Sequence, residues 1–212
     1  GANVLLQADQ SSCWNWPMGS VLMSALALEV TPRPANYFDV LCAAMHFVSN
    51  DPRAIFLGQG VGNPGTTMSD TFKFVPQSQL LEMPVAEDMQ MGMAIGMSLE
   101  GKLPVCVFPR WNFLICAANQ LVNHLDRLPL YSGYRPKVII RTAVPSNKPF
   151  DPGPQHDDDF TRAFGLMLRT VKIVRLVSSA MIVPEYQKAV EADHSTLLVE
   201  FTEFYKEARG GT

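Results

Sequence analysis

The stretch that decides the fold is AIFLGQGVG, residues 54–62. It opens with four apolar residues and continues into glycines, which is typical of a buried strand that ends in a loop. Just before it, residues 35–49 carry apolar side chains at three- and four-residue spacing, which predicts an amphipathic helix that ends before Asp51-Pro52. Helix, strand and glycine-rich loop therefore form the first unit of the fold.

The rest of the chain repeats this alternation. We expect helices over 86–100 and 184–193, and a further helix directly after the aspartates 157–159. Another helix is expected where four apolar residues recur at four-residue spacing and so share one face: Phe113, Ala117, Leu121 and Leu125. We expect strands over 104–108, 137–141, 171–176 and 196–201. The alternation predicts an α/β domain over 33–207, a mostly parallel sheet with helices on both faces. Residues 1–32 are an N-terminal extension of unclear role, and 208–212 are a tail.

Composition excludes several functions. Only 17% of the 212 residues are charged, and 17 basic residues face 20 acidic ones, so there is no basic surface to neutralise nucleic-acid phosphates. No apolar run approaches the roughly 20 residues that span a bilayer, so no membrane association is expected. The four cysteines show no CxxC spacing and no signal peptide is evident, which predicts a cytoplasmic protein. Low charge and 11 methionines favour an oligomer, because interface cores are poor in charge and rich in Met.

The glycine-rich loop only partly matches a dinucleotide-binding motif. Gly58 and Gly60 fit the opening of GxGxxG, but the third position is Asn63, and no Walker-type GxxxxGK[ST] motif occurs. A nucleotide site is therefore disfavoured. A loop at the carboxyl end of a parallel strand still predicts the wall of a binding site.

Three further segments carry candidate site residues. Glu87 begins a helix with Gly92 and Gly96 four residues apart, which by itself fits an acid at a helix N-terminus and close packing on a neighbour. Asn112-Phe113 follows a strand, and Gln155-His156 follows a loop rich in Pro and Gly. The aspartates 157–159 suit the start of a helix; consecutive positions fan out around it, so they are not expected to converge on a cation.

In this order and spacing, the segments resemble the pyrimidine-binding domain of thiamine-diphosphate enzymes, specifically the beta subunit of the first component of 2-oxo acid dehydrogenase complexes. The resemblance covers residues 34–206. The matching motifs are residues 50–62, Pro84-Val85-Ala86-Glu87, Gly92 and Gly96, Asn112-Phe113, residues 120–123, Arg141 and Gln155-His156.

The resemblance implies a cofactor site for thiamine diphosphate. Glu87 would hydrogen-bond a ring nitrogen of the aminopyrimidine and favour the imino tautomer that deprotonates the thiazolium carbon. Phe113 would pack on the pyrimidine face, and Gln59 and Phe108 would complete the cofactor pocket. In the family an acidic pair follows the glycine of the first strand, whereas here Gln59 and Gly60 stand there.

The resemblance also implies a reaction and partners. Glu87 and His156 would be catalytic, with His156 and Gln155 facing the 2-oxo acid, which would be decarboxylated with transfer of the acyl or aldehyde unit. The family's Gly-Asp-Gly motif, which holds the diphosphate through Mg²⁺ or Ca²⁺, is missing. No metal site is therefore expected in this chain; an alpha-like partner would hold the ion, in a heterotetramer with a second copy. A transketolase-like two-carbon transferase subunit and a non-catalytic scaffold or regulatory subunit remain alternatives.

Overall fold

The computed structural model describes residues 36–63, 68–146 and 153–206. The expected boundaries of the terminal segments, 1–32 and 208–212, involve residues outside these ranges. The strands are β1 (Ala54–Gly58), β2 (Leu80–Glu82), β3 (Leu103–Val107), β4 (Ile139–Val144), β5 (Lys172–Arg175) and β6 (Thr196–Phe201). The α-helices are α1 (Tyr37–Ser49), α2 (Glu87–Leu99), α3 (Trp111–Leu114), α4 (Leu128–Tyr131), α5 (Thr161–Met167) and α6 (Ser179–Glu191). Shorter helical turns are η1 (Ser69–Phe72), η2 (Gln77–Gln79), η3 (Ile115–Ala117), η4 (Gln120–Leu125) and η5 (Thr202–Lys206).

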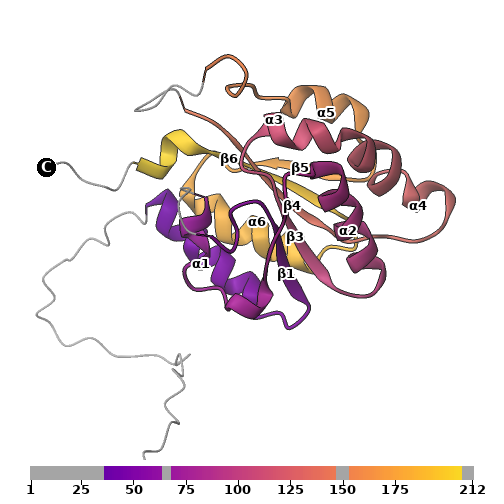
Figure 1. The fold of residues 1–212 in the computed structure, drawn as a ribbon, viewed down its shortest axis with the longest axis horizontal. Coiled ribbons are helices and arrows are strands. Elements are labelled where there is room, and N and C mark those ends of the chain that lie inside the picture. The colour runs from indigo at the N-terminus through magenta and orange to yellow at the C-terminus, as the bar shows by residue number, and fades with distance from the viewer. Residues whose placement is uncertain (1–35, 64–67, 147–152, 207–212) are drawn as a thin grey trace, which may run out of the picture. The chain divides into compact units, whose positions relative to one another are not determined.

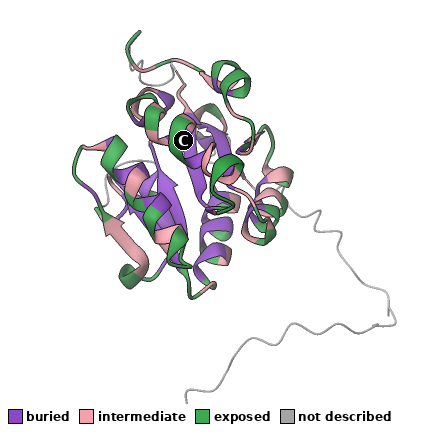
Figure 2. Ribbon diagram, turned by 90° about the vertical axis from the view of Figure 1, so that its right-hand side faces the viewer, coloured by how far each residue is buried: buried purple, intermediate pink, exposed green. Residues whose placement is uncertain are grey.

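These strands form one six-stranded sheet in the order β2-β1-β3-β4-β6-β5. Every pairing is parallel, including Phe56 with Val105 and Arg141 with Leu198. The central strands are buried on both faces, as parallel strands covered by helices require (Figure 2). The predicted α/β fold is confirmed.

Helices cover the two faces of the sheet (Figure 1). One core cluster joins α1, α6 and η1 to the sheet through residues such as Met45 and Tyr186. The other joins α2, α3, η4 and α5 to the opposite face, with Trp111 and Phe164 among its largest side chains. None of the helices in the described ranges is long and apolar enough to cross a membrane.

Two sequence predictions of helix boundaries are wrong. The helix expected to start at Pro184 starts at Ser179, and Pro184 lies inside it. The extra turn places the fully buried Ile182 on the sheet, and that burial outweighs the one backbone hydrogen bond that proline cannot donate. The single helix expected along 113–125 is divided into α3, η3 and η4, although Leu121 and Leu125 are buried as expected.

Candidate functional site

The candidate site residues lie at the carboxyl edge of the sheet. Gln59 directly follows β1, and Phe108 directly follows β3. From β1 the chain passes to β2 on one side of the sheet, and it then crosses to β3 on the other side, so the strand order reverses between β1 and β3. In open parallel sheets the crevice outside such a reversal is the usual place for a ligand.

The turn after β1 is shaped by its glycines and by Glu82. A Cβ on Gly58 would lie 2.4 Å from the backbone oxygen of Val107, so no larger residue fits without moving β3. Gly60 has a φ of 71°, a conformation that favours glycine. The Glu82 carboxylate accepts the backbone N–H groups of Gly60 and Gly62 at 2.6 and 2.7 Å. The role of Glu82 is not evident from the sequence, since it ends a strand of only three residues.

Glu87 is the first residue of α2 and is only 9% exposed. Its position at a helix N-terminus stabilises a negative charge. Gln59 donates from Nε2 to Glu87 Oε1 at 3.1 Å, which joins the turn after β1 to the start of α2. One helical turn further, the buried Gln90 donates to the Val107 oxygen at 2.9 Å. The start of α2 is therefore tied to the ends of β1 and β3, and Gln59 contacts the carboxylate itself.

Phe113 and His156 form the second contact of the site. Their ring centroids are 5.5 Å apart at an interplanar angle of 44°. Phe113 lies in α3, after β3, and His156 lies in the loop after β4, where its N–H donates to the Gly153 oxygen. Asn112, beside Phe113, donates to Asp158 Oδ2 at 2.9 Å and so holds the loop against α3.

Two buried polar atoms in this group lack a hydrogen bond to any described residue: His156 Nδ1 and Asn112 Oδ1. Buried polar atoms without a partner are costly and uncommon in folded proteins. A water molecule or a polar ligand would complete the hydrogen bonding of these two atoms.

The remaining predicted residues are placed differently. Phe108 is 1% exposed and lies in the core, with its N–H donating to the Arg141 oxygen at 2.8 Å. Gln155 is exposed in the loop before His156. The structure thus brings together Gln59 with Glu87 and Phe113 with His156, whereas it buries Phe108 and leaves Gln155 at the surface.

The aspartates 157–159 precede α5, and two of them have separate partners. Asp158 accepts from Asn112, whereas Asp159 accepts the backbone N–H of Thr161 at 2.9 Å and pairs with Arg175 at 3.3 Å. Within the described ranges, no group of three or more His, Cys, Asp or Glu side chains could hold a metal ion.

Arg141 is the centre of a buried ion pair behind the site. Its Nε and Nη2 donate to Glu200 at 2.5 and 3.0 Å, and both side chains are fully buried. Tyr186 and Tyr205 also donate to Glu200. Burial, together with the negative charge of Glu200, raises the pKa of both tyrosines well above the ordinary value. Arg141 therefore has a structural partner, Glu200, and is fully buried.

The known proteins that resemble this chain include the following three beta subunits. The chain is 32% identical over 99 residues to the pyruvate dehydrogenase E1 component subunit beta of Staurastrum punctulatum, covering 44% of this chain and 30% of that one. The Chaetosphaeridium globosum subunit is 31% identical over 99 residues, with the same coverage. The chloroplastic subunit beta-4 of Oryza sativa subsp. japonica is 27% identical over 117 residues, 54% of this chain and 29% of that one. No family model matches the chain.

Among solved structures, the fold is similar to a chain described as split gene transketolase, inactive beta4 tetramer. The TM-score is 0.63 at 16% identity, over 80% of this chain and 52% of that one. Each match spans only part of its relative, about 30% of the length of the three subunits.

Together the relatives and the fold neighbour support a transketolase-like domain of the β type found in thiamine-diphosphate enzymes. The resemblance inferred from the sequence is confirmed at that level.

Proposed function

We propose that this chain is the pyrimidine-binding, β-like subunit of a thiamine-diphosphate-dependent enzyme that decarboxylates a 2-oxo acid and transfers the acyl or aldehyde unit. The observation that carries the proposal is the buried Glu87 carboxylate at the start of α2, held by Gln59 at the point where the strand order reverses. The β-type relatives support the same class of enzyme.

The residues at this edge fit the aminopyrimidine half of the cofactor. Glu87 offers a carboxylate for a ring nitrogen, and the half-buried Phe113 ring offers an apolar face. The unpaired His156 Nδ1 and Asn112 Oδ1 offer hydrogen bonds that a polar ligand would complete. When bound, thiamine diphosphate supplies an electron sink for cleaving the bond beside the 2-oxo carbon.

Each residue then has a defined role. Glu87 would hydrogen-bond the pyrimidine nitrogen, and its near-complete burial would keep water from weakening that hydrogen bond. Gln59 orients the carboxylate by donating to Oε1 and leaves the other oxygen for the cofactor. His156, with Phe113 packed on its ring, faces the reacting 2-oxo acid. Gln155 would contact the substrate from the same loop.

The diphosphate and its Mg²⁺ or Ca²⁺ would be held by an alpha-like partner. The chain contains no Gly-Asp-Gly motif, and the described residues offer no metal-binding cluster. The enzyme would therefore act only as a complex. We also propose that this complex is cytoplasmic.

A second copy of the chain would cover the exposed side of α2. Met89, Met93 and Leu99 are exposed there, and a Cβ added to Gly92 or Gly96 would meet no atom within 4 Å. An apolar helix side with open glycines allows another backbone to approach closely. The solved neighbour is itself described as a β4 tetramer.

Self-association is tested with charge on this helix. Met89→Asp/Met93→Asp should convert the wild-type oligomer into monomers in sedimentation velocity, because two carboxylates would be buried without partners. Leu166→Asp is the matched control, since Leu166 is an exposed apolar residue on α5. A wild-type chain that stays monomeric, or equal dissociation in the control, would contradict the α2 interface.

Activity of the assembled complex is tested first with pyruvate as the substrate. Glu87→Gln should lower turnover of pyruvate by about 10²- to 10⁴-fold, the usual contribution of a positioned acid or base. Asp88→Asn, an exposed acid in the same helical turn, should leave turnover unchanged. Wild-type turnover by Glu87→Gln would sink the assignment.

The second candidate function, two-carbon transfer from a ketose phosphate, is distinguished by products. The fold neighbour motivates it, although 16% identity shows the fold alone. Turnover of a ketose phosphate with an aldose acceptor, without turnover of pyruvate, would favour this candidate. Turnover of neither substrate by a complex that binds the cofactor would favour the scaffold or regulatory alternative.

A further inference from the structure

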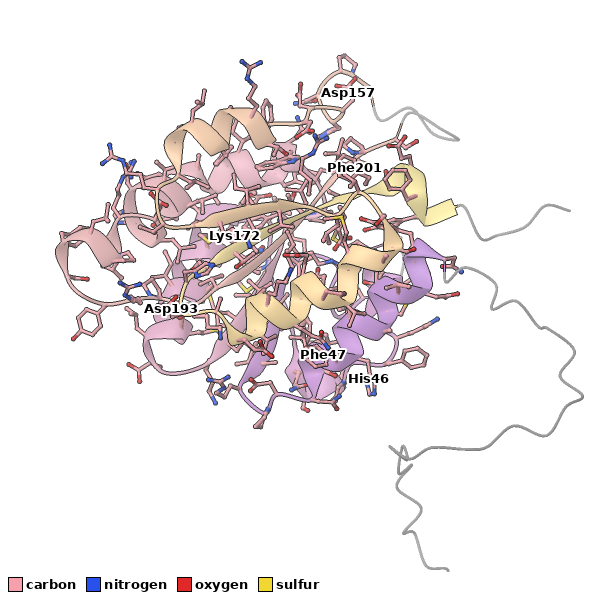
Figure 3. The ribbon with its side chains drawn as sticks, turned by 180° about the vertical axis from the view of Figure 1, so that it is seen from behind. His46, Phe47, Asp157, Lys172, Asp193 and Phe201 are labelled. Carbon is pink, nitrogen blue, oxygen red and sulfur yellow. The ribbon has the colours of Figure 1, made fainter. Side chains whose placement is uncertain are left out.

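A hollow lies at the amino edge of the sheet, away from the candidate site. It is a cavity of about 430 Å³, lined among others by Lys172 at the start of β5, Pro136 before β4 and Ser195 before β6. Figure 3 shows Lys172 and Asp193 at this end of the sheet, with Phe201, at the carboxyl end of β6, toward the other end. The volume falls in the range of small-molecule sites, roughly 300 to 1,000 Å³.

One wall of the cavity is fixed by a buried carboxylate. Asp126 Oδ1 accepts the backbone N–H groups of Arg169, Thr170 and Val171 at 2.8, 2.7 and 3.0 Å. Asp126 itself is fully buried. Three hydrogen bonds to one oxygen hold residues 169–171 in a single conformation.

A second part of the lining is fixed by Ser195. Its hydroxyl donates to the Pro136 oxygen at 2.7 Å and accepts the Val138 N–H at 3.0 Å, which joins the start of β4 to the start of β6. A cavity between two fixed walls needs little ordering when a ligand enters, so less affinity is lost to conformational entropy.

The rim of the cavity is basic, although the whole chain carries a net charge of −3. Arg135, Arg169 and Lys172 line it, together with His194 and a single acid, Asp193. Asp193 is paired with Arg135 at 3.2 Å and contacts His194 at 3.3 Å. Its negative charge is thus already engaged, whereas the cavity keeps a positive formal excess that attracts anions.

The lining also has an apolar part, formed by Leu125, Pro129, Leu130 and Val171. A basic rim beside an apolar wall suits a molecule with a charged group at one end and an apolar body at the other.

We propose that this cavity binds a small organic anion, whose carboxylate or phosphate group contacts Arg169 and Lys172 and whose apolar body packs against Leu125 and Leu130. The site is separate from the carboxyl-edge residues and does not depend on the function proposed for them.

Calorimetric titration of the full-length chain tests this proposal with four probes. Phenyl phosphate and benzoate should bind saturably, whereas benzyl alcohol and inorganic phosphate should each bind at least about tenfold more weakly, since each lacks one half of the recognised structure. Whichever of the two organic anions binds more tightly identifies the charged group that the cavity prefers. Absence of saturable binding by both organic anions would overturn the proposal, as would inorganic phosphate binding as tightly as phenyl phosphate.

Variants locate the binding. Arg169→Glu/Lys172→Glu should weaken phenyl phosphate at least about tenfold, while Arg162→Glu, an exposed basic residue of α5 that does not line the cavity, should change it less than about twofold. The milder Arg169→Gln/Lys172→Gln guards against misfolding and should give an intermediate loss. Circular dichroism verifies that each variant is folded. Equal losses in the double variants and the control would place the binding elsewhere and refute the proposal.

Discussion

The buried ion pair between Arg141 and Glu200 makes the strongest prediction about stability. Glu200→Gln removes the negative charge while keeping the shape of the side chain, so the guanidinium of Arg141, fully buried, loses its counter-charge. Breaking a buried pair from one side costs about 3 to 5 kcal/mol. Tyr186 and Tyr205 also donate to Glu200 and would lose a charged acceptor, which places the cost toward the upper end. A loss of that size is a large fraction of the about 5 to 15 kcal/mol that stabilises an ordinary domain.

Urea unfolding monitored by far-ultraviolet circular dichroism measures this loss. Lys188→Gln is the control, because the Lys188–Glu185 pair has an exposed lysine and should contribute less than about 1 kcal/mol. The double variant Arg141→Met/Glu200→Leu should be more stable than Glu200→Gln, since it leaves no unpaired charge. A Glu200→Gln protein as stable as Lys188→Gln would refute the reasoning.

Two further predictions concern the glycine turn and the cysteines. Gly58→Ala should lower the free energy of unfolding by roughly 1 to 3 kcal/mol, because the added Cβ would meet the Val107 oxygen at 2.4 Å. Gly165→Ala, which has open space around it in α5, should be neutral or stabilising by up to about 1 kcal/mol. Equal effects of the two substitutions in urea unfolding would contradict the tight turn. Burial raises the pKa of Cys106 to about 12, so at pH 8 iodoacetamide should modify the exposed Cys116 and spare Cys106 in peptide mapping by mass spectrometry. Rapid alkylation of Cys106 in the folded protein would show that its thiol is accessible.

The sequence predicts the elements best where burial is complete. Strand 196–201 is found with the expected bounds, because its leucines, valine and phenylalanine favour a buried strand of a parallel sheet, in which all six residues are buried. Strand β2 escaped prediction, since three residues with half-buried leucines and an exposed Glu82 show no pattern of their own. The start of α6 was wrong because proline is usually found in the first turn, whereas here tertiary packing of Ile182 extends the helix.

The sequence predicts where the candidate site residues lie in the helices and loops, but not which side chains contact one another. The place of Glu87 at a helix start follows from its neighbours in sequence. Its contact with Gln59, 28 residues away, and the pairing of Phe113 with His156 arise only when strand ends meet at one edge of the sheet. The burial of Phe108 could not be foreseen either, since a residue at a strand end can face the core or the crevice. The roles of these residues stay predictions.

The central claim is that Glu87 activates thiamine diphosphate. It is tested most directly by measuring hydrogen–deuterium exchange at the thiazolium C2 position with proton NMR, in the assembled complex with Mg²⁺. The wild-type complex should accelerate exchange over free cofactor. Glu87→Gln should lose about 10²-fold or more of that acceleration, while Asp88→Asn retains it. Equal exchange in the wild-type and Glu87→Gln complexes, with cofactor bound in both, would contradict the account.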